Sequence, residues 1–100
     1  MLRRTNFARV NLIHELTLGI CKASFRKVSK GQYRNMFCTL NSGMIPEKYK
    51  NTLLEIYKTQ ENPDILPVFD IKEQTWKSFY IPKLVLFITS DELKKDKRFT

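Results

Sequence analysis

The segment from Asp64 to Thr89, DILPVFDIKEQTWKSFYIPKLVLFIT, constrains the fold of this chain more than any other part of the sequence. Its β-branched and aromatic residues, interrupted by polar and proline positions, predict three short strands in succession. These strands would cover residues 65–71, 76–81 and 84–89. The first two carry large apolar side chains on both faces, and such a sheet is not stable alone in water. The remainder of the chain must therefore cover it.

The N-terminal part of the chain predicts a helix over residues 7–18. Apolar residues recur there at helical spacing, so we expect Val10 and Leu16 to lie on the side that faces the core. Arg9 is expected on the solvent side. Gly19 follows the helix at the place where a left-handed residue commonly ends one.

The apolar pattern predicts a strand register for each of two hairpins. Residues 20–40 alternate apolar and polar side chains around a turn at 29–32, which predicts a hairpin with Ala23 opposite Cys38. In the later segment, pairing residue 71 with residue 76 places Asp70 opposite Lys77. Both registers gather apolar residues onto one face of the first hairpin and both faces of the second.

A second helix is expected to begin near Pro46 and to run to Gln60. The order helix, two strands, helix, three strands predicts an α+β domain that is mostly β. We expect a small five-stranded Sm/SH3-like barrel over residues 1–93, with an N-terminal helix and a helix between strands 2 and 3. The alternative is an open α+β sheet with both helices on one face. Residues 94–100 are expected to form a basic, flexible tail.

The positive charge is concentrated at the N-terminal end. The 100-residue chain has a net charge of +8. Residues 1–40 hold eight basic residues and one acidic residue, a surplus of +7, whereas the rest of the chain holds ten basic and nine acidic residues. This asymmetry favours a polyanionic partner, either a nucleic acid or an acidic protein face. The alternative is a basic surface that is merely solvated.

Several classes of chemistry have little support. Cys21 and Cys38 fall within predicted strands, which is typical of buried free thiols in a reducing compartment. The single histidine, His14, and two separated cysteines do not make a metal site. No glycine-rich phosphate loop is present, and no apolar run approaches the ~20 residues of a transmembrane helix. We therefore expect no metal, no cofactor, no membrane contact and no enzyme activity.

Two stretches resemble the short phage-encoded WYL-type proteins. In the first, the hairpin is followed by TLN at 39–41 and IPE at 45–47; in the second, VFD at 68–70 precedes a turn and WKSF at 76–79. The resemblance covers roughly residues 23–88 and departs at Tyr80, where the family tends to have a basic residue. It implies an Sm-like SH3 barrel encoded by a tailed phage. Larger WYL proteins are similar to regulatory domains that sense ligands, often nucleic acids.

Basic residues interleaved with aromatic ones can hold phosphates and stack unpaired bases. The expected nucleic-acid contacts come from the first hairpin and from the 76–81 strand. They are Lys22, Arg26, Lys27, Lys30, Tyr33, Arg34, Phe37, Trp76, Lys77 and Tyr80. The sequence thus predicts a non-enzymatic phage accessory protein, serving host takeover or counter-defence in the cytoplasm of the infected bacterium. It would bind RNA, another nucleic acid or a ribonucleoprotein through its basic hairpin.

A protein partner is the competing prediction. Small phage proteins of this kind often attach to a host enzyme, toxin or polymerase and inhibit or modulate it. An exposed strand edge, at residues 65–71 or 84–89, could pair with a partner sheet. Pro67 fits an edge strand, because it has no N–H to donate to a neighbour.

Overall fold

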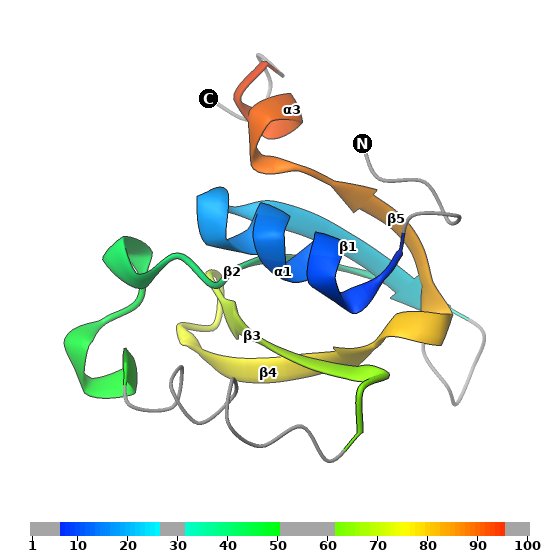
Figure 1. The fold of residues 1–100 in the computed structure, drawn as a ribbon, viewed down its shortest axis with the longest axis horizontal. Helices are drawn as coiled ribbons and strands as arrows, with labels where there is room; N and C mark the ends of the chain where they lie inside the picture. Colours follow the sequence, from blue (N-terminus) through cyan, green and yellow to red (C-terminus); the bar gives the residue numbers. More distant parts are fainter. Residues whose placement is uncertain (1–6, 27–31, 51–61, 96–100) are drawn as a thin grey trace.

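The computed structural model describes residues 7–26, 32–50 and 62–95. Five β-strands, two α-helices and short 3₁₀ turns make up most of this part of the chain. In order the elements are α1 (Arg9–Leu18), β1 (Cys21–Arg26), β2 (Tyr33–Thr39), η2 (Ser42–Met44), η3 (Glu47–Tyr49), β3 (Ile65–Asp70), β4 (Thr75–Tyr80), η4 (Ile81–Lys83), β5 (Leu84–Ile88) and α3 (Ser90–Lys95). Figure 1 shows α1 lying across the sheet, with α3 beyond the end of β5.

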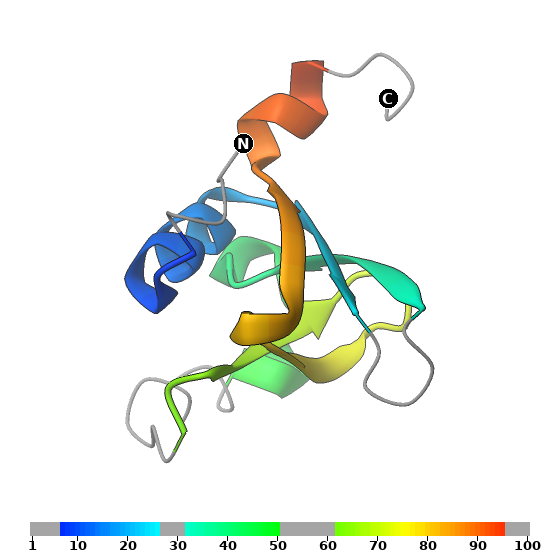
Figure 2. The ribbon, with the colours of Figure 1, turned by 90° about the vertical axis from the view of Figure 1, so that its right-hand side faces the viewer.

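The strands form one five-stranded antiparallel sheet in the order β4-β3-β2-β1-β5. The five predicted strands are therefore confirmed, but the closed form of the barrel is not. Within the described residues β4 and β5 are edges, because η4 with Pro82 separates them and β5 pairs with β1. In Figure 2, β5 runs beside β1 while β3 and β4 lie apart from it. The predicted helix over 46–60 begins as the 3₁₀ turn η3, and residues 51–60 lie outside the described residues.

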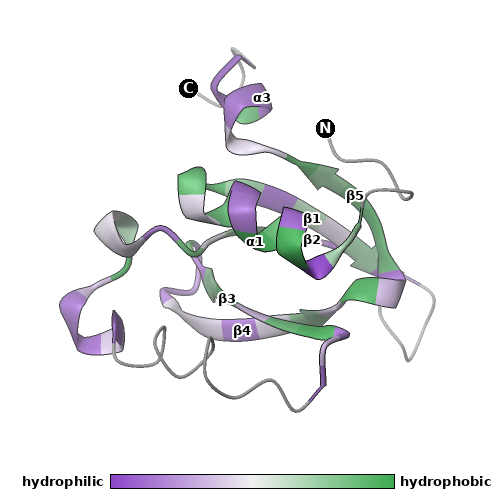
Figure 3. Ribbon diagram, viewed as in Figure 1, coloured by the Kyte–Doolittle hydropathy of each residue, from purple (hydrophilic) through white to green (hydrophobic). Residues whose placement is uncertain are grey.

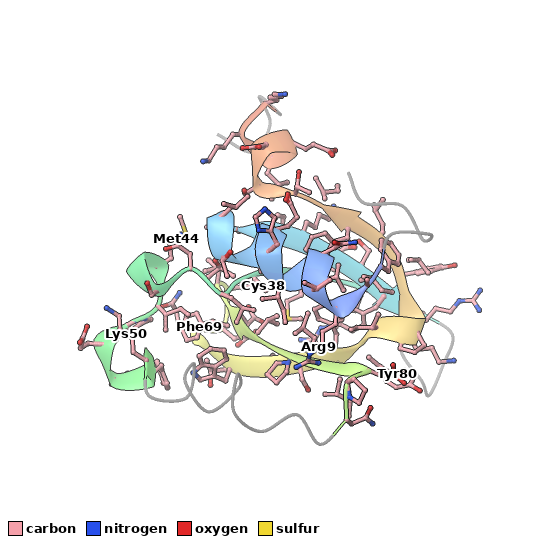
Figure 4. The ribbon with its side chains drawn as sticks, viewed as in Figure 1. Arg9, Cys38, Met44, Lys50, Phe69 and Tyr80 are labelled. Atoms are coloured by element: carbon pink, nitrogen blue, oxygen red, sulfur yellow. The ribbon has the colours of Figure 1, made fainter. Side chains whose placement is uncertain are left out.

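The core lies between α1 and the inner face of the sheet. Leu12 and Leu16 are fully buried against inward side chains from all five strands. Val10 was predicted to face the core from α1. This prediction is wrong, because the Val10 side chain is 71% exposed. Arg9, expected in solvent, instead donates from Nη1 to the backbone oxygens of Pro63 (3.1 Å) and Ile65 (2.6 Å). Figure 4 shows Arg9 beside β3, where it ties the start of the helix to the start of that strand.

Both predicted hairpin registers are wrong by two residues. Cys21 rather than Ala23 lies opposite Cys38. In the second hairpin, Phe69 rather than Ile71 lies opposite Trp76. A shift of two residues leaves every side chain on its predicted face, so the apolar pattern could not reveal the error. In the second hairpin the turn, not the pattern, decides between the two registers.

Asp70 determines the turn between β3 and β4. Its buried carboxylate accepts hydrogen bonds from the backbone N–H groups of Lys72 (2.9 Å) and Glu73 (3.1 Å) through Oδ1. Its carbonyl accepts from Gln74 (2.8 Å), whose φ of 54° closes the turn. Oδ2 lies 3.7 Å from Lys77 Nζ, so the predicted ion pair forms, although Asp70 is directly opposite Thr75. An aspartate that caps its own turn in this way is a common turn device.

The C-terminal helix α3 replaces part of the predicted flexible tail. Lys94 and Lys95 belong to α3, and residues 96–100 lie outside the described residues. Gly19 is extended (φ 165°), not left-handed, and a Cβ there would meet Ser90 Cβ at 3.0 Å. The small residue therefore lets α3 approach the end of α1. Figure 3 shows the mostly hydrophilic α3 after the hydrophobic β5, and Leu93 is the apolar residue of α3 that turns inward, 5% exposed.

Replacing Asp70 tests its control of the turn. Asp70→Ala removes the acceptor of two backbone N–H groups, so we expect the free energy of unfolding to fall by about 2 kcal/mol. Asp70→Asn keeps the Oδ1 acceptor of the turn but replaces the oxygen that faces Lys77 by an NH₂ group, so we expect a smaller loss than in Asp70→Ala. Urea denaturation of the three proteins measures both changes. Equal losses in the two variants would show that the turn hydrogen bonds contribute nothing specific.

Candidate functional site

The first hairpin presents a polar and aromatic outer face opposite the core. Three cross-strand pairs line it: Lys22 with Phe37, Ser24 with Asn35, and Arg26 with Tyr33. Alternate residues of a strand share a face, so these side chains lie on the side away from Cys21, Ala23 and Met36. We call these six residues the outer hairpin face: Lys22, Ser24, Arg26, Tyr33, Asn35 and Phe37.

Two cations on this face lie over aromatic rings. Lys22 Nζ is 6.0 Å from the centre of the Phe37 ring, and the Arg26 guanidinium is 5.6 Å from that of Tyr33. Arg26 also donates to the Tyr33 hydroxyl at 3.5 Å. Such contacts stabilise by about 0.5–1 kcal/mol at exposed sites, enough to favour one position of each cation over many. Tyr33 remains 60% exposed, so its ring is accessible.

Arg34 belongs to the same hairpin but not to the outer hairpin face. It lies opposite Phe25, at the exposed start of β2. Together with Asn35, Met36 and Phe37 it lines one wall of a cleft of about 120 Å³, whose other wall is the β3–β4 turn. Lys27 and Lys30, two further predicted contacts, lie outside the described residues.

The predicted contacts from β4 are not brought onto the outer hairpin face. Trp76 packs edge-on against Phe69 (5.7 Å between ring centres) and donates from Nε1 to the Tyr49 carbonyl at 3.3 Å. Lys77 is the partner of the buried Asp70. Tyr80 is 41% exposed at the far end of β4, as Figure 4 shows, and lies opposite Ile65. In these contacts Trp76 and Lys77 have structural roles.

Asn35 and Glu73 were not among the nucleic-acid contacts predicted from the sequence. Ser24 Oγ donates to Asn35 Oδ1 at 2.5 Å, which orients the amide, and Glu73 joins the cleft from the β3–β4 turn. Only the true register between β2 and β3 brings these two residues to one cleft. The pairing of Ser24 with Asn35 lies between β1 and β2 and was absent from the predicted register, so it gave no indication of the cleft that Asn35 shares with Glu73.

The two cysteines are deeply buried. Burial raises the pKa of the Cys21 thiol to about 12, and Cys21 Sγ donates to the carbonyls of Glu15 (3.4 Å) and Gly19 (3.9 Å). Burial, with smaller contributions from Cys21 and Asp70, also raises the pKa of Cys38 well above its ordinary value. Both cysteines are free thiols. At neutral pH neither would hold a useful fraction of the reactive thiolate.

Neither a cluster of metal-ligand residues nor a membrane-spanning helix is found in the described ranges. Among those residues no three His, Cys, Asp or Glu side chains are grouped as metal ligands would be. The helices of the described part are all too short or too polar to cross a bilayer.

The sequence is similar to a known protein family and to a phage protein. Residues 9–85 match a family described as WYL_2, with an Sm-like SH3 β-barrel fold. The chain is also 32% identical over 71 residues to an uncharacterized 11.5 kDa protein from the Gp31–cd intergenic region of Enterobacteria phage T4. That alignment covers 71% of this chain and 68% of the phage protein. No solved structure matches the chain.

The raised thiol pKa values predict inert cysteines. Native protein at pH 8 should react with iodoacetamide at neither Cys21 nor Cys38, because both thiols are protonated and buried. After unfolding in guanidinium chloride, both should be alkylated, which intact mass spectrometry measures directly. Rapid alkylation of either cysteine in the native protein would show that the β1–β2 core opens readily.

Proposed function

Because this chain belongs to the WYL_2 family of Sm-like SH3 β-barrel folds, we propose that it acts by binding nucleic acid and has no enzymatic activity. RNA, or a complex that contains RNA, is the leading ligand. The phage T4 relative supports a setting in an infected bacterium. There the protein would serve as an accessory factor in host takeover or counter-defence, in the host cytoplasm.

The observation that carries this proposal is the pairing of cations with aromatic rings on the outer hairpin face. Lys22 with Phe37 and Arg26 with Tyr33 form two cross-strand units of the same chemistry. In each unit a cation can bind a phosphate while the neighbouring ring offers a surface for a base. Bases stack on such rings whatever their sequence, so these units supply affinity rather than selectivity.

The distribution of charge supports the same ligand. The surplus of +7 over residues 1–40 includes Lys22, Arg26 and Arg34, which the structure places on one hairpin. By contrast, Lys77 and Lys50 are paired with the carboxylates of Asp70 and Glu47. The hairpin cations have no ion-pair partner among the described residues, so they are available to phosphates.

A host protein is the second candidate partner, and α1 provides the observation in its favour. Val10 and Leu18 are 71% and 50% exposed, and they lie two turns apart on the same side of the helix. A partner that packs against this side of α1 would bury both side chains. Under this alternative the protein would inhibit or modulate a host enzyme, toxin or polymerase.

Removing the hairpin cations tests the proposed function. In a variant with Lys22, Arg26 and Arg34 replaced by Ser, we expect binding to single-stranded RNA to weaken sharply. The slope of log affinity against log salt should become shallower by about 2, because three phosphate contacts are lost. Fluorescence anisotropy of labelled RNA at several salt concentrations measures both quantities.

The matched control replaces Lys48, Lys83 and Lys95 by Ser, which lowers the net charge by the same amount at exposed positions elsewhere. It should keep most of the affinity of the unaltered protein. If both triple variants lose RNA affinity equally, RNA binding depends only on the net charge of the protein. The outer hairpin face is then not a specific RNA-binding site. If neither variant changes RNA binding, the hairpin cations are not the RNA contacts and the proposed site is wrong.

A further inference from the structure

The edge of β2 is open along the first half of the strand. β1 runs beside β2 from Tyr33 to Cys38, whereas β3 pairs with it only at Cys38 and Thr39. A last hydrogen bond joins the Ile71 N–H to the Phe37 carbonyl at 2.9 Å. Upstream of Phe37, no strand of the described chain lies on this side of β2, and the cleft of about 120 Å³ occupies the place.

The backbone groups that face this opening belong to Tyr33 and Asn35. In an antiparallel strand the N–H and C=O of one residue point to the same side, and the side alternates from residue to residue. The Phe37 carbonyl bonds to Ile71 on the β3 side, so the groups of Tyr33 and Asn35 point to that side as well. Both residues are exposed, and no described backbone group bonds to them there. Two N–H donors and two C=O acceptors therefore follow one another at the spacing of a strand.

The corresponding part of β3 is protected, in contrast to β2. The first half of β3 also lacks a partner on the β2 side, because the pairing between the two strands involves only Phe69 and Asp70. There Pro67 has no N–H to donate, and the Ile65 carbonyl is occupied by Arg9 Nη1 at 2.6 Å. Proline and capping side chains are common protections of an unpaired strand edge. The open edge of β2 has neither within the described residues, and such an edge can pair with another extended chain.

The charges around the open edge indicate which kind of chain it would accept. Arg34 and Lys72 line the cleft, and Asp70 is already bonded within its turn and to Lys77. Glu73 is the other carboxylate of the lining, so Arg34 and Lys72 leave a surplus of one positive charge. A second copy of the protein would add its own net charge of +8 and a second Arg34 to this surplus. A strand with an acidic side chain would complement it instead.

We propose that the open edge of β2 binds a short, extended, acidic segment of a partner protein. The segment pairs through its backbone with Tyr33 and Asn35, and so continues the sheet where β3 ends. Its acidic side chain lies beside Arg34. The open part of β2 spans about 14 Å, so about six residues of the partner suffice. This peptide site goes beyond the proposed function, because it uses backbone groups at the edge of the sheet rather than the cations of the outer hairpin face.

The probe is a labelled peptide, Thr-Val-Glu-Val-Thr-Val, which places one acidic residue in a sequence that favours the extended conformation. Fluorescence anisotropy measures its binding to the protein in the absence of RNA. We expect saturable binding, about fivefold tighter than that of the same peptide with Lys in place of Glu. The acidic peptide methylated on its backbone nitrogens should bind about tenfold more weakly, because it keeps the charge but cannot donate hydrogen bonds to β2.

Two proline variants of the protein locate the peptide site. Asn35→Pro removes the N–H that faces the cleft and none that faces β1, so the affinity for the acidic peptide should fall about fivefold. Ser78→Pro is the matched control on the edge of β4. Ser78 lies opposite Pro67, which cannot donate, so the Ser78 N–H points away from β3. This control should keep the affinity, and thermal denaturation shows whether each variant is folded.

A charge reversal decides the matter if Asn35→Pro does not fold. Arg34 is exposed, and Arg34→Glu should make the protein prefer the Lys peptide over the Glu peptide. An unchanged preference in this variant would overturn the proposal. So would equal affinity for the methylated and unmethylated peptides, or unchanged peptide affinity in a folded Asn35→Pro protein.

A second copy of the protein is the other possible occupant of the open edge. Sedimentation velocity would then show a dimer that Asn35→Pro abolishes, and that result would also overturn the peptide site. Because no RNA is present in any of these measurements, the peptide site and the proposed RNA binding can fail independently of one another.

Discussion

The buried carboxylate of Asp70 is the contact on which the arrangement of the sheet depends. It holds the β3–β4 turn through two backbone N–H groups, sets the register of that hairpin and neutralises Lys77. The same residue faces Cys38, at one of the two pairs that join β2 to β3. Because the chain turns away after Ile71, whose N–H makes the last hydrogen bond to β2, the cleft between β2 and the β3–β4 turn opens there. One side chain thus links the stability of the second hairpin to the shape of the candidate site.

The structure also separates basic residues that stabilise the fold from those available for a ligand. Arg9 binds two backbone carbonyls where the chain enters β3, and Lys77 is tied to Asp70. Lys22 and Arg26 instead lie over aromatic rings on the outer hairpin face. A net charge of +8 alone would not distinguish these roles. The positions of the cations relative to the sheet carry the functional argument.

Much of the fold could be predicted because apolar alternation determines which face of a strand is buried. Cys21, Ala23, Met36 and Val68 are all in the core as their spacing indicates. Register could not be obtained in this way, since a shift of two residues preserves the pattern, and in the second hairpin it is the Asp70 turn that distinguishes the alternatives. The same limit applies to the site: the cations of the hairpin were visible in the sequence. The meeting of Asn35 with Glu73 was not, because it depends on how β2 approaches the β3–β4 turn.

The central claim, that the first hairpin is the ligand-binding surface, can be tested residue by residue. Titration of ¹⁵N-labelled protein with a short single-stranded RNA, followed by two-dimensional NMR, would map the contact surface without any substitution. The account predicts the largest shift changes in the backbone amides of β1 and β2, from Lys22 to Arg26 and from Tyr33 to Phe37. Changes concentrated on α1 around Val10 and Leu18, with the hairpin unaffected, would contradict it.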